Sequence, residues 1–196
     1  GWQKIDGAWY YFGNEKNGAM QVGWQIVDHE YYYIVDSGVM QTYWRKIDGN
    51  YYFFGANGVR RTGWQKIWGK WYYLDENGVM QTGWQKIKGV WYYFGGASDG
   101  AMKTGWQQVY GKWYYLGKEN DGAMKYYWQK IDGKYYWLGH GNDGAMKTYW
   151  QKVNNAYYFL GSDGIMRTGW QSIWGKWYYL NSSGAMLTGW QKIDNN

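Results

Sequence analysis

Residues 2–12 read WQKIDGAWYYF and carry the pattern from which the fold follows. Asp6-Gly7 stands between two short runs of alternating side chains, and such a pair is the strongest short-range sign of a two-residue hairpin turn. Pairing the strands outward from this turn sets these residues opposite each other: Ile5 and Ala8, Lys4 and Trp9, Gln3 and Tyr10, Trp2 and Tyr11. The stretch therefore predicts a short antiparallel β-hairpin.

Alternation along the two strands gives this hairpin two faces. One face holds the aliphatic side chains and is predicted to form the core; it carries Ile5, Tyr10 and Phe12. The other face carries Trp2, Trp9 and Tyr11. This second face gathers rings with few aliphatic partners, which makes it the candidate surface for a ligand.

The hairpin pattern recurs along the whole chain at intervals of 20 or 22 residues. Its units start near Trp2, Trp24, Trp44, Trp64, Trp84, Trp106, Trp128, Trp150 and Trp170, with a partial tenth unit at Trp190. All differences in length fall in the second turn of a unit, where two extra residues preserve strand parity. Because a lone hairpin is marginal in water, the units must bury their faces on one another. We predict one all-β repeat module over residues 1–196, a β-solenoid of nine stacked two-stranded hairpins plus a partial tenth repeat.

The composition agrees with a core built from rings and narrows the function classes. The chain has 18 Trp and 24 Tyr, no Cys, no Pro and a net charge of +6. Without Cys, a disulfide scaffold and a thiolate-bound metal are excluded. His29 and His140 fall in separate predicted turns, so we expect no metal site and no cofactor. No apolar run is long enough to span a membrane, and the opening Gly1-Trp2, already inside the pattern, favours a mature protein or an excised module.

Neither catalysis nor nucleic-acid binding is expected from the distribution of charged groups. Nearly all carboxylates stand in or beside turns, where turn chemistry explains them, and no nucleophile has a base nearby in the pattern. A basic chain rich in rings could stack nucleic-acid bases. However, the positive charge is diluted by 15 acidic residues in the same turns, so no continuous basic stripe is predicted. We expect a binding module, with any catalytic domain outside this chain.

The combined spacing of the residue types that recur in every unit is far more specific than any single motif. Residues 83–84 read GW, residues 91–94 read WYYF, and residues 100–106 read GAMKTGW. This combination resembles the choline-binding repeat, also called the cell-wall-binding repeat, and the likeness covers all nine units. The resemblance implies a solenoid of hairpins, secreted to the bacterial cell surface, that binds choline or phosphocholine on teichoic and lipoteichoic acids. Such modules hold the choline in aromatic cages between consecutive hairpins.

The resemblance also implies the walls of each cage. They are the first tryptophan of a unit, its first triplet aromatic, the third triplet aromatic of the next unit, and the methionine between them. The choline-binding residues carried over in this way are Trp2, Trp9, Tyr33 and Met20; Trp64, Trp71, Tyr93 and Met80; Trp84, Trp91, Tyr115 and Met102; Trp106, Trp113, Trp137 and Met124; Trp150, Tyr157, Tyr179 and Met166. The chemistry fits, because ring faces and a thioether suit a methylated cation that has no N–H to donate.

Several units depart from this pattern. Arg60 stands where the third cage should have its methionine, and a cation there would repel another cation. In three units Tyr43, Tyr127 and Tyr149 replace the glycine before the tryptophan, where glycine could answer a need for space.

The sequence also leaves other functions open. A glucan- or oligosaccharide-binding repeat is the nearest alternative, because sugars stack on rings and the glutamine after most unit tryptophans, such as Gln25 and Gln65, could hold hydroxyls. We expect these glutamines to face the core and to satisfy backbone groups instead. Lys4, Lys66 and Lys86 form a predicted solvated row that could also touch polymer phosphates. A structural spacer, whose rings are all covered by neighbouring hairpins, is the remaining possibility.

Overall fold

The structure is a computed structural model that describes residues 1–13 and 17–193 of the chain. The described residues form eighteen short strands. The first ten are β1 (Trp2–Ile5), β2 (Ala8–Tyr11), β3 (Gly23–Val27), β4 (Glu30–Ile34), β5 (Tyr43–Ile47), β6 (Asn50–Phe54), β7 (Gly63–Ile67), β8 (Lys70–Leu74), β9 (Gly83–Ile87) and β10 (Val90–Phe94). The others are β11 (Gly105–Val109), β12 (Lys112–Leu116), β13 (Trp128–Ile131), β14 (Lys134–Trp137), β15 (Tyr149–Val153), β16 (Ala156–Leu160), β17 (Gly169–Ile173) and β18 (Lys176–Leu180).

Each odd-numbered strand pairs with the strand that follows it, so the described residues contain nine two-stranded hairpins. The predicted pairing of the first hairpin is confirmed residue by residue, from Ile5 opposite Ala8 to Trp2 opposite Tyr11. Its turn residues Asp6 and Gly7 have φ values of 49° and 84°. Positive φ at both central positions defines the two-residue turn whose twist matches antiparallel strands. Residues 14–16, inside the first predicted second turn, and residues 194–196, at the end of the partial tenth repeat, lie outside the described residues.

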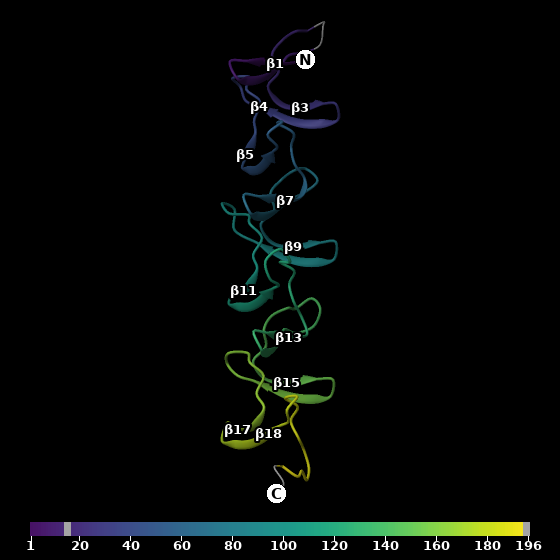
Figure 1. Cartoon of the computed structure of the whole chain (residues 1–196), viewed down its shortest axis with the longest axis vertical. Coiled ribbons are helices and arrows are strands. Elements are labelled where there is room, and N and C mark those ends of the chain that lie inside the picture. The colour runs from purple at the N-terminus through teal and green to yellow at the C-terminus, as the bar shows by residue number, and fades with distance from the viewer. Residues whose placement is uncertain (14–16, 194–196) are drawn as a thin grey trace. The chain divides into compact units, whose positions relative to one another are not determined.

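By compactness the chain divides into two units. Unit 1 comprises residues 1–85 and 93–102, and unit 2 comprises residues 86–92 and 103–196. The border runs through the β9–β10 hairpin. The sequence-based expectation of a single module over 1–196 stays a prediction. Figure 1 shows the hairpins of unit 2 following one another, with β11 and β17 on one side of the view and β15 on the other.

Backbone hydrogen bonds join consecutive hairpins within each unit. In unit 1 the Met40 amide, just after β4, donates to the Trp9 carbonyl on β2 at 2.8 Å. In unit 2 the Met166 amide, after β16, donates to the Tyr135 carbonyl on β14 at 2.9 Å. The methionine of one repeat is therefore fixed beside the first triplet ring of the repeat before it.

In most hairpins the aliphatic side chains at the predicted core positions are buried, but in the first hairpin the prediction is wrong for Ile5, which is 46 % exposed, and Tyr10 and Phe12 are only half-buried. The residue that ends the second strand, or directly follows it, is fully buried in eight hairpins: Ile34, Phe54, Leu74, Phe94, Leu116, Leu138, Leu160 and Leu180. The aliphatic residue before the hairpin turn is also buried at Ile47, Ile67, Ile87, Val109, Ile131, Val153 and Ile173. Among the described residues no helix has the length and apolarity that a membrane crossing requires.

From the second repeat onward, the residue before the unit tryptophan has a left-handed backbone. Gly63 and Gly105 have φ values of 69° and 67°, and a Cβ added at either would meet no atom within 4 Å. Tyr43, Tyr127 and Tyr149 adopt the same conformation, with φ between 59° and 62°. The need for space proposed from the sequence is therefore wrong, and the glycines answer a conformational requirement instead.

Candidate functional site

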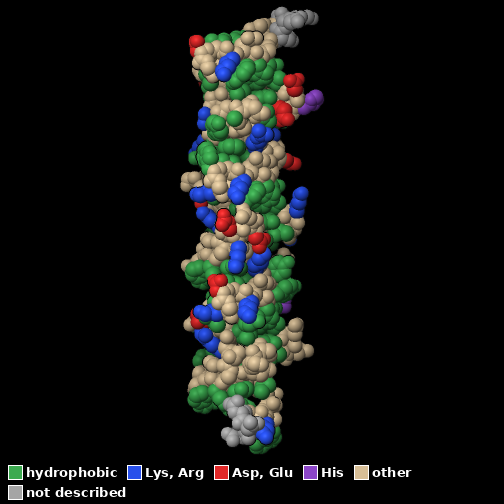
Figure 2. All heavy atoms as spheres, in the orientation of Figure 1, with side chains coloured by type: hydrophobic (Ala, Val, Ile, Leu, Met, Phe, Trp, Pro, Cys, Tyr) green, Lys and Arg blue, Asp and Glu red, His purple; other side chains and the backbone are tan. Residues whose placement is uncertain are grey.

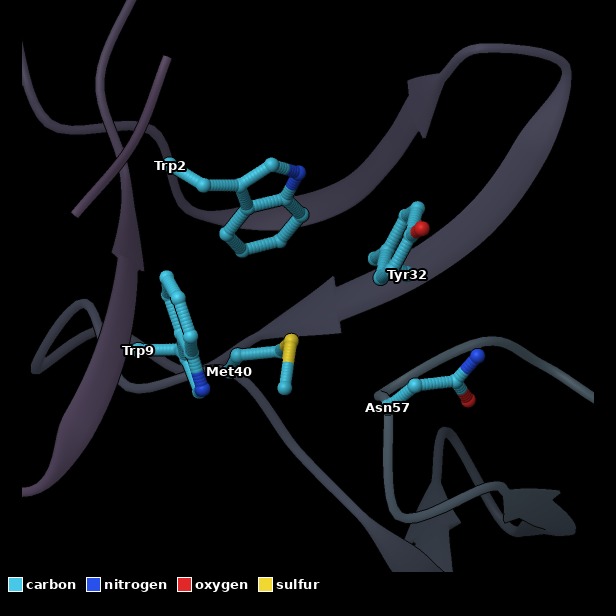
Figure 3. Close-up of a pocket in the computed structure, with 5 residues that line it drawn as sticks. All are labelled: Trp2, Trp9, Tyr32, Met40 and Asn57. Atoms are coloured by element: carbon cyan, nitrogen blue, oxygen red, sulfur yellow. The ribbon is translucent and has the colours of Figure 1, made fainter. Parts of the chain in front are cut away.

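A notch lined by three rings and a thioether lies between the first hairpins of unit 1. Trp2, Trp9, Tyr32 and Met40 line a cavity of about 330 Å³, with Asn57 at its far side. That volume is at the lower end of the range for small-molecule sites, roughly 300–1,000 Å³. The Trp2 and Tyr32 ring centroids are 4.8 Å apart. Figure 3 shows the three rings around a common space, with the Met40 thioether between Trp9 and Tyr32. We call this the first notch.

Similar notches, again lined by three rings and a methionine, occur in unit 2 and are numbered by the repeat that begins them. The sixth notch is lined by Trp106, Trp113, Tyr136 and Met146, with Ser162 and Asp163 at its edge. The seventh notch is lined by Trp128, Tyr135, Tyr158 and Met166, with Ser182 and Ser183 at its edge. In both, the centroid of the first tryptophan lies 5.0 Å from that of the tyrosine of the next hairpin. The same walls thus recur in both units.

Three successive repeats build each notch. In the first notch, β1 and β2 supply Trp2 and Trp9, β4 supplies Tyr32, and Met40 follows β4. Asn57 comes from the turn after the third hairpin. The core face of one hairpin is thus laid against the ring face of the hairpin before it. As a result, rings from the tryptophan face of one hairpin and from the core face of the next hairpin line the same cavity.

The third wall differs from the one that the resemblance implied. Register pairs Tyr33 with Trp24 of its own hairpin, and their centroids are 5.2 Å apart. The same in-hairpin pairing holds for Tyr93 with Trp84, Tyr115 with Trp106, Trp137 with Trp128 and Tyr179 with Trp170. Trp137 is also only 5 % exposed. The notch wall is instead the middle ring of the triplet, which the sequence analysis assigned to the core.

The methionine that lines a notch also differs from the one that the resemblance implied, because it comes from the next repeat along the chain. Met20 lies against Gly38, away from the space that Trp2 and Trp9 enclose. Met124 is buried and its amide donates to the Trp91 carbonyl in the preceding repeat. By the same bond Met80 belongs with Tyr51 and Met102 with Trp71, whereas Met166 lines the seventh notch.

The paired tryptophans of each predicted cage are placed as follows. Trp2 with Trp9, and Trp106 with Trp113, line notches together. The ring centroids of Trp64 and Trp71 lie 6.3 Å apart in unit 1. In unit 2 the Trp150 ring centroid lies 5.0 Å from that of Tyr178. The Tyr157 carbonyl accepts a hydrogen bond from the Met186 amide. Trp84 belongs to unit 1 and Trp91 to unit 2. Alternation along β4 places Tyr32 on the face opposite to Tyr33, but it does not show that this face meets Trp2, since that depends on how the hairpins stack.

Arg60 lies in the second notch rather than in the third. That notch has Trp24, Tyr31 and Tyr52 as its rings, and the Arg60 guanidinium carbon lies 4.1 Å from the Tyr31 centroid. The shift has the same cause as for the methionines, because the Arg60 amide donates to the Tyr31 carbonyl at 2.8 Å. The third notch has Met80 in this place.

The tyrosine phenols in the notch walls keep their protons at neutral pH and are uncharged. Burial, with help from nearby carboxylates, raises the pKa of the Tyr32, Tyr72 and Tyr136 phenols above the ordinary value of 10.0. At the edge of the sixth notch, burial raises the pKa of Asp163, but hydrogen bonds from the Ile165 amide and from Arg167 outweigh it and hold that pKa below its ordinary value. The Asp163 carboxylate is thus charged and paired with Arg167 at 2.9 Å.

Lysines cover the first triplet ring of several hairpins. The Lys4 ammonium lies 6.0 Å from the Trp9 centroid, and Lys46, Lys130 and Lys152 lie 5.3–5.6 Å from their cross-strand tyrosines. On the face shown in Figure 2, Lys and Arg side chains are scattered among apolar patches and do not form one stripe.

The glutamines after the unit tryptophans bind the backbone, as the sequence analysis expected. The Gln65 amide donates to the Thr62 carbonyl at 2.8 Å. The same bond, to the carbonyl three residues earlier, is made by Gln25, Gln85, Gln107, Gln129, Gln151, Gln171 and Gln191. Within residues 1–13 and 17–193, no three His, Cys, Asp or Glu side chains cluster as metal ligands would.

Solved structures with the same fold support the predicted hairpin solenoid. CbpJ from Streptococcus pneumoniae TIGR4 is 31% identical over 99% of this chain and 89% of its own, with a TM-score of 0.72. A crystal structure of CbpF in complex with ipratropium, obtained by soaking, is 33% identical over 92% of this chain and 63% of its own, with a TM-score of 0.78. The choline-binding domain of CbpL from Streptococcus pneumoniae is 31% identical over 85% of this chain and 87% of its own, with a TM-score of 0.59. The predicted fold class is confirmed.

Family models give the same assignment from the sequence. No curated protein sequence matches the chain significantly. The model described as "Choline-binding repeat" matches residues 1–43, 41–81, 61–106, 81–128, 147–187 and 167–196. A second, described as "Putative cell wall binding repeat", matches residues 128–146. The chain belongs to the choline-binding repeat family.

Proposed function

We propose that this chain is a binding module that attaches to bacterial cell walls by holding choline groups of teichoic and lipoteichoic acids in its notches. It acts outside the cell and carries no catalysis of its own. The observation that carries the proposal is the repeated wall set of the first, sixth and seventh notches: two rings from one hairpin, one from the next, and a methionine thioether.

The chemistry of these walls suits a trimethylammonium group. Such a cation has no N–H, so carbonyl and carboxylate acceptors give it no hydrogen bond, whereas ring faces attract it and pack against its methyl groups. Each ring contributes about 0.5–1 kcal/mol when exposed and about 2 kcal/mol when desolvated. Three half-buried rings therefore supply a few kcal/mol, which corresponds to a dissociation constant in the millimolar range.

Relatives with solved structures support this choice of ligand class. The matched CbpL domain is named as choline-binding, and the matched CbpF structure holds ipratropium. Ipratropium is itself a quaternary ammonium compound, which supports a methylated cation as the ligand class.

The arrangement of the glutamines favours choline over a glucan. A sugar needs free planar amides beside the rings for its hydroxyls. Here one N–H of the Gln65 amide is donated to the Thr62 carbonyl, which holds the side chain along its own backbone, and seven equivalent glutamines make the same bond.

Tryptophan fluorescence tests the proposal directly. Titration with choline should give a saturable response with a midpoint in the millimolar range, and glucose oligomers at the same concentrations should give little response. A flat choline curve together with a saturable sugar response would refute it.

A matched pair of variants tests the walls. The response of the Trp2 indole N–H signal in NMR reports the first notch alone. Tyr32→Leu removes a wall and should weaken that response at least about threefold, in line with a ring contact of about 1 kcal/mol. Tyr33→Leu, one residue along and outside the notch, should leave it within experimental error. Equal losses in both variants would mean that the hairpin, not the notch, was damaged.

A further inference from the structure

The second notch has the same ring frame as the others. The Trp24 and Tyr52 centroids lie 4.9 Å apart, as Trp2 and Tyr32 do at 4.8 Å. The Arg60 amide is bound to the Tyr31 carbonyl at 2.8 Å, as the Met40 amide is bound to the Trp9 carbonyl at 2.8 Å. Arg60 therefore stands in the backbone position that the notch methionine occupies elsewhere.

The charged end of Arg60 lies where a cationic ligand would be attracted. Its guanidinium carbon is 4.1 Å from the Tyr31 centroid and 5.9 Å from the Trp24 centroid. Both distances are within the roughly 6 Å over which a ring face holds a cation. The outer end of the guanidinium donates a hydrogen bond from Nη2 to the Glu76 carbonyl at 3.2 Å. The Nε atom is buried and has no hydrogen-bond partner among the described residues. The rings, rather than acceptors, surround this cation.

The stem of Arg60 is held as a methionine is held. A Cβ at Gly78 would come within 2.6 Å of Arg60 Cδ, and the equivalent Gly58 is packed equally closely against Met40. The stem thus fills the place of the thioether. The extra length of arginine then extends the guanidinium over the rings.

Tyr31, which stands in place of a second tryptophan, does not by itself distinguish the second notch from the open notches. The seventh notch also has a tyrosine there, Tyr135, yet with Met166 it encloses an open cavity of about 290 Å³. Two features set the second notch apart from the seventh: Arg60 replaces the methionine, and Ile26 replaces the lysine opposite the first triplet ring. The Lys130 ammonium lies near the Tyr135 ring of the seventh notch, which is nevertheless open, so the cation that distinguishes the second notch is the one at the methionine position.

We propose that Arg60 is a built-in ligand of the second notch, which occupies the place of a choline and removes this notch from the set that binds the polymer. This inference rests on the proposed function of the other notches. It makes residue 60 a specificity-determining position: methionine leaves a notch open, and arginine closes it with a cation of the chain itself.

NMR of single indole N–H signals tests this with two reciprocal variants. In the unmodified chain, choline should move the Trp2 signal and leave the Trp24 signal in place. In Arg60→Met, the Trp24 signal should become responsive, with a midpoint within about threefold of that for Trp2, a difference below 1 kcal/mol. In Met40→Arg, the Trp2 signal should lose its response. Gly78 already accommodates a side chain with the stem of methionine, so Arg60→Met is expected to fold.

The outcomes separate this inference from the proposed function. A Trp24 response in the unmodified chain equal to that of Trp2, or a silent Trp24 in Arg60→Met while Trp2 responds, overturns the inference and leaves the proposed function standing. Silence of both signals in every variant overturns the proposed function. The position of the Arg60 Nε–H signal without choline then still decides the placement: ring currents should move it upfield of Arg61, and a position equal to that of Arg61 would show that no ring lies over it.

Discussion

Position 63 shows how a single backbone conformation recurs before the unit tryptophan from the second repeat onward. Gly63 has φ 69° in open space, and it stands directly before the notch tryptophan Trp64. The residue turns the chain into the strand that carries this tryptophan. Because an L-residue in the left-handed region strains against its own carbonyl, glycine is favoured there without any neighbour demanding it.

We expect Gly63→Ala to lower the free energy of unfolding by about 1–2 kcal/mol, the cost of a left-handed conformation for an ordinary residue. Asn tolerates this conformation, so Gly63→Asn should cost clearly less. Urea midpoints at unchanged slope would measure both. Equal losses for Ala and Asn would point to a contact that the open space around Gly63 does not show.

The middle tyrosine of the triplet marks the limit of what the sequence revealed at this scale. Alternation correctly separated Tyr10 and its equivalents from the tryptophan face. It says nothing about which neighbouring hairpin a face will meet, because that depends on how the repeats are turned against one another. Tyr32 was therefore assigned to the core, and Tyr33 was carried over in its place from the family resemblance. The structure places Tyr32 over Trp2.

The hairpin is the element that the sequence predicted best. Turn and register were read from Asp6-Gly7, and both hold in the structure. Less expected turns keep the same geometry with unsuited residues: Tyr110 has φ 48° and is 91 % exposed, and Trp68 has φ 49°. The turn type is thus imposed by strand pairing even where the local sequence disfavours it.

Exchanging turn residues between two hairpins should move stability in opposite directions. Tyr110→Asn should raise the free energy of unfolding by about 1 kcal/mol, because Asn enters the left-handed region readily and the exposed ring gives up few contacts. Asp132→Tyr, at the equivalent position of the next hairpin, should lower it by a similar amount. Thermal midpoints would measure both changes. A loss in Tyr110→Asn would mean that the tyrosine ring makes stabilising contacts.

At the scale of the whole chain, the proposed function has several weak notches binding one polymer that carries many choline groups. Once one notch is occupied, the next choline is supplied at a high effective concentration, which raises the overall affinity by about 10²–10⁴ without any new contact. The net charge of +6 adds attraction to an anionic polymer, and salt screens that part.

We therefore expect the chain to be retained on a choline-bearing polymer at least about 100-fold more tightly than it binds free choline. Free choline should elute it, whereas the same concentration of sodium chloride should elute little, because salt screens the lysines but does not fill the notches. Retention assays with the two eluents would measure this. Equal elution by both would assign the binding to net charge.

The construction of each notch from three successive repeats has a consequence for how such chains grow. Duplicating one 20-residue repeat inside the array would insert a hairpin that contributes residues to three consecutive notches. Such a duplication adds one notch and leaves its neighbours whole, wherever it falls. A single repeat cut from the array would keep its own tryptophan face but would enclose no cavity, so three consecutive repeats are the smallest piece that can bind a ligand.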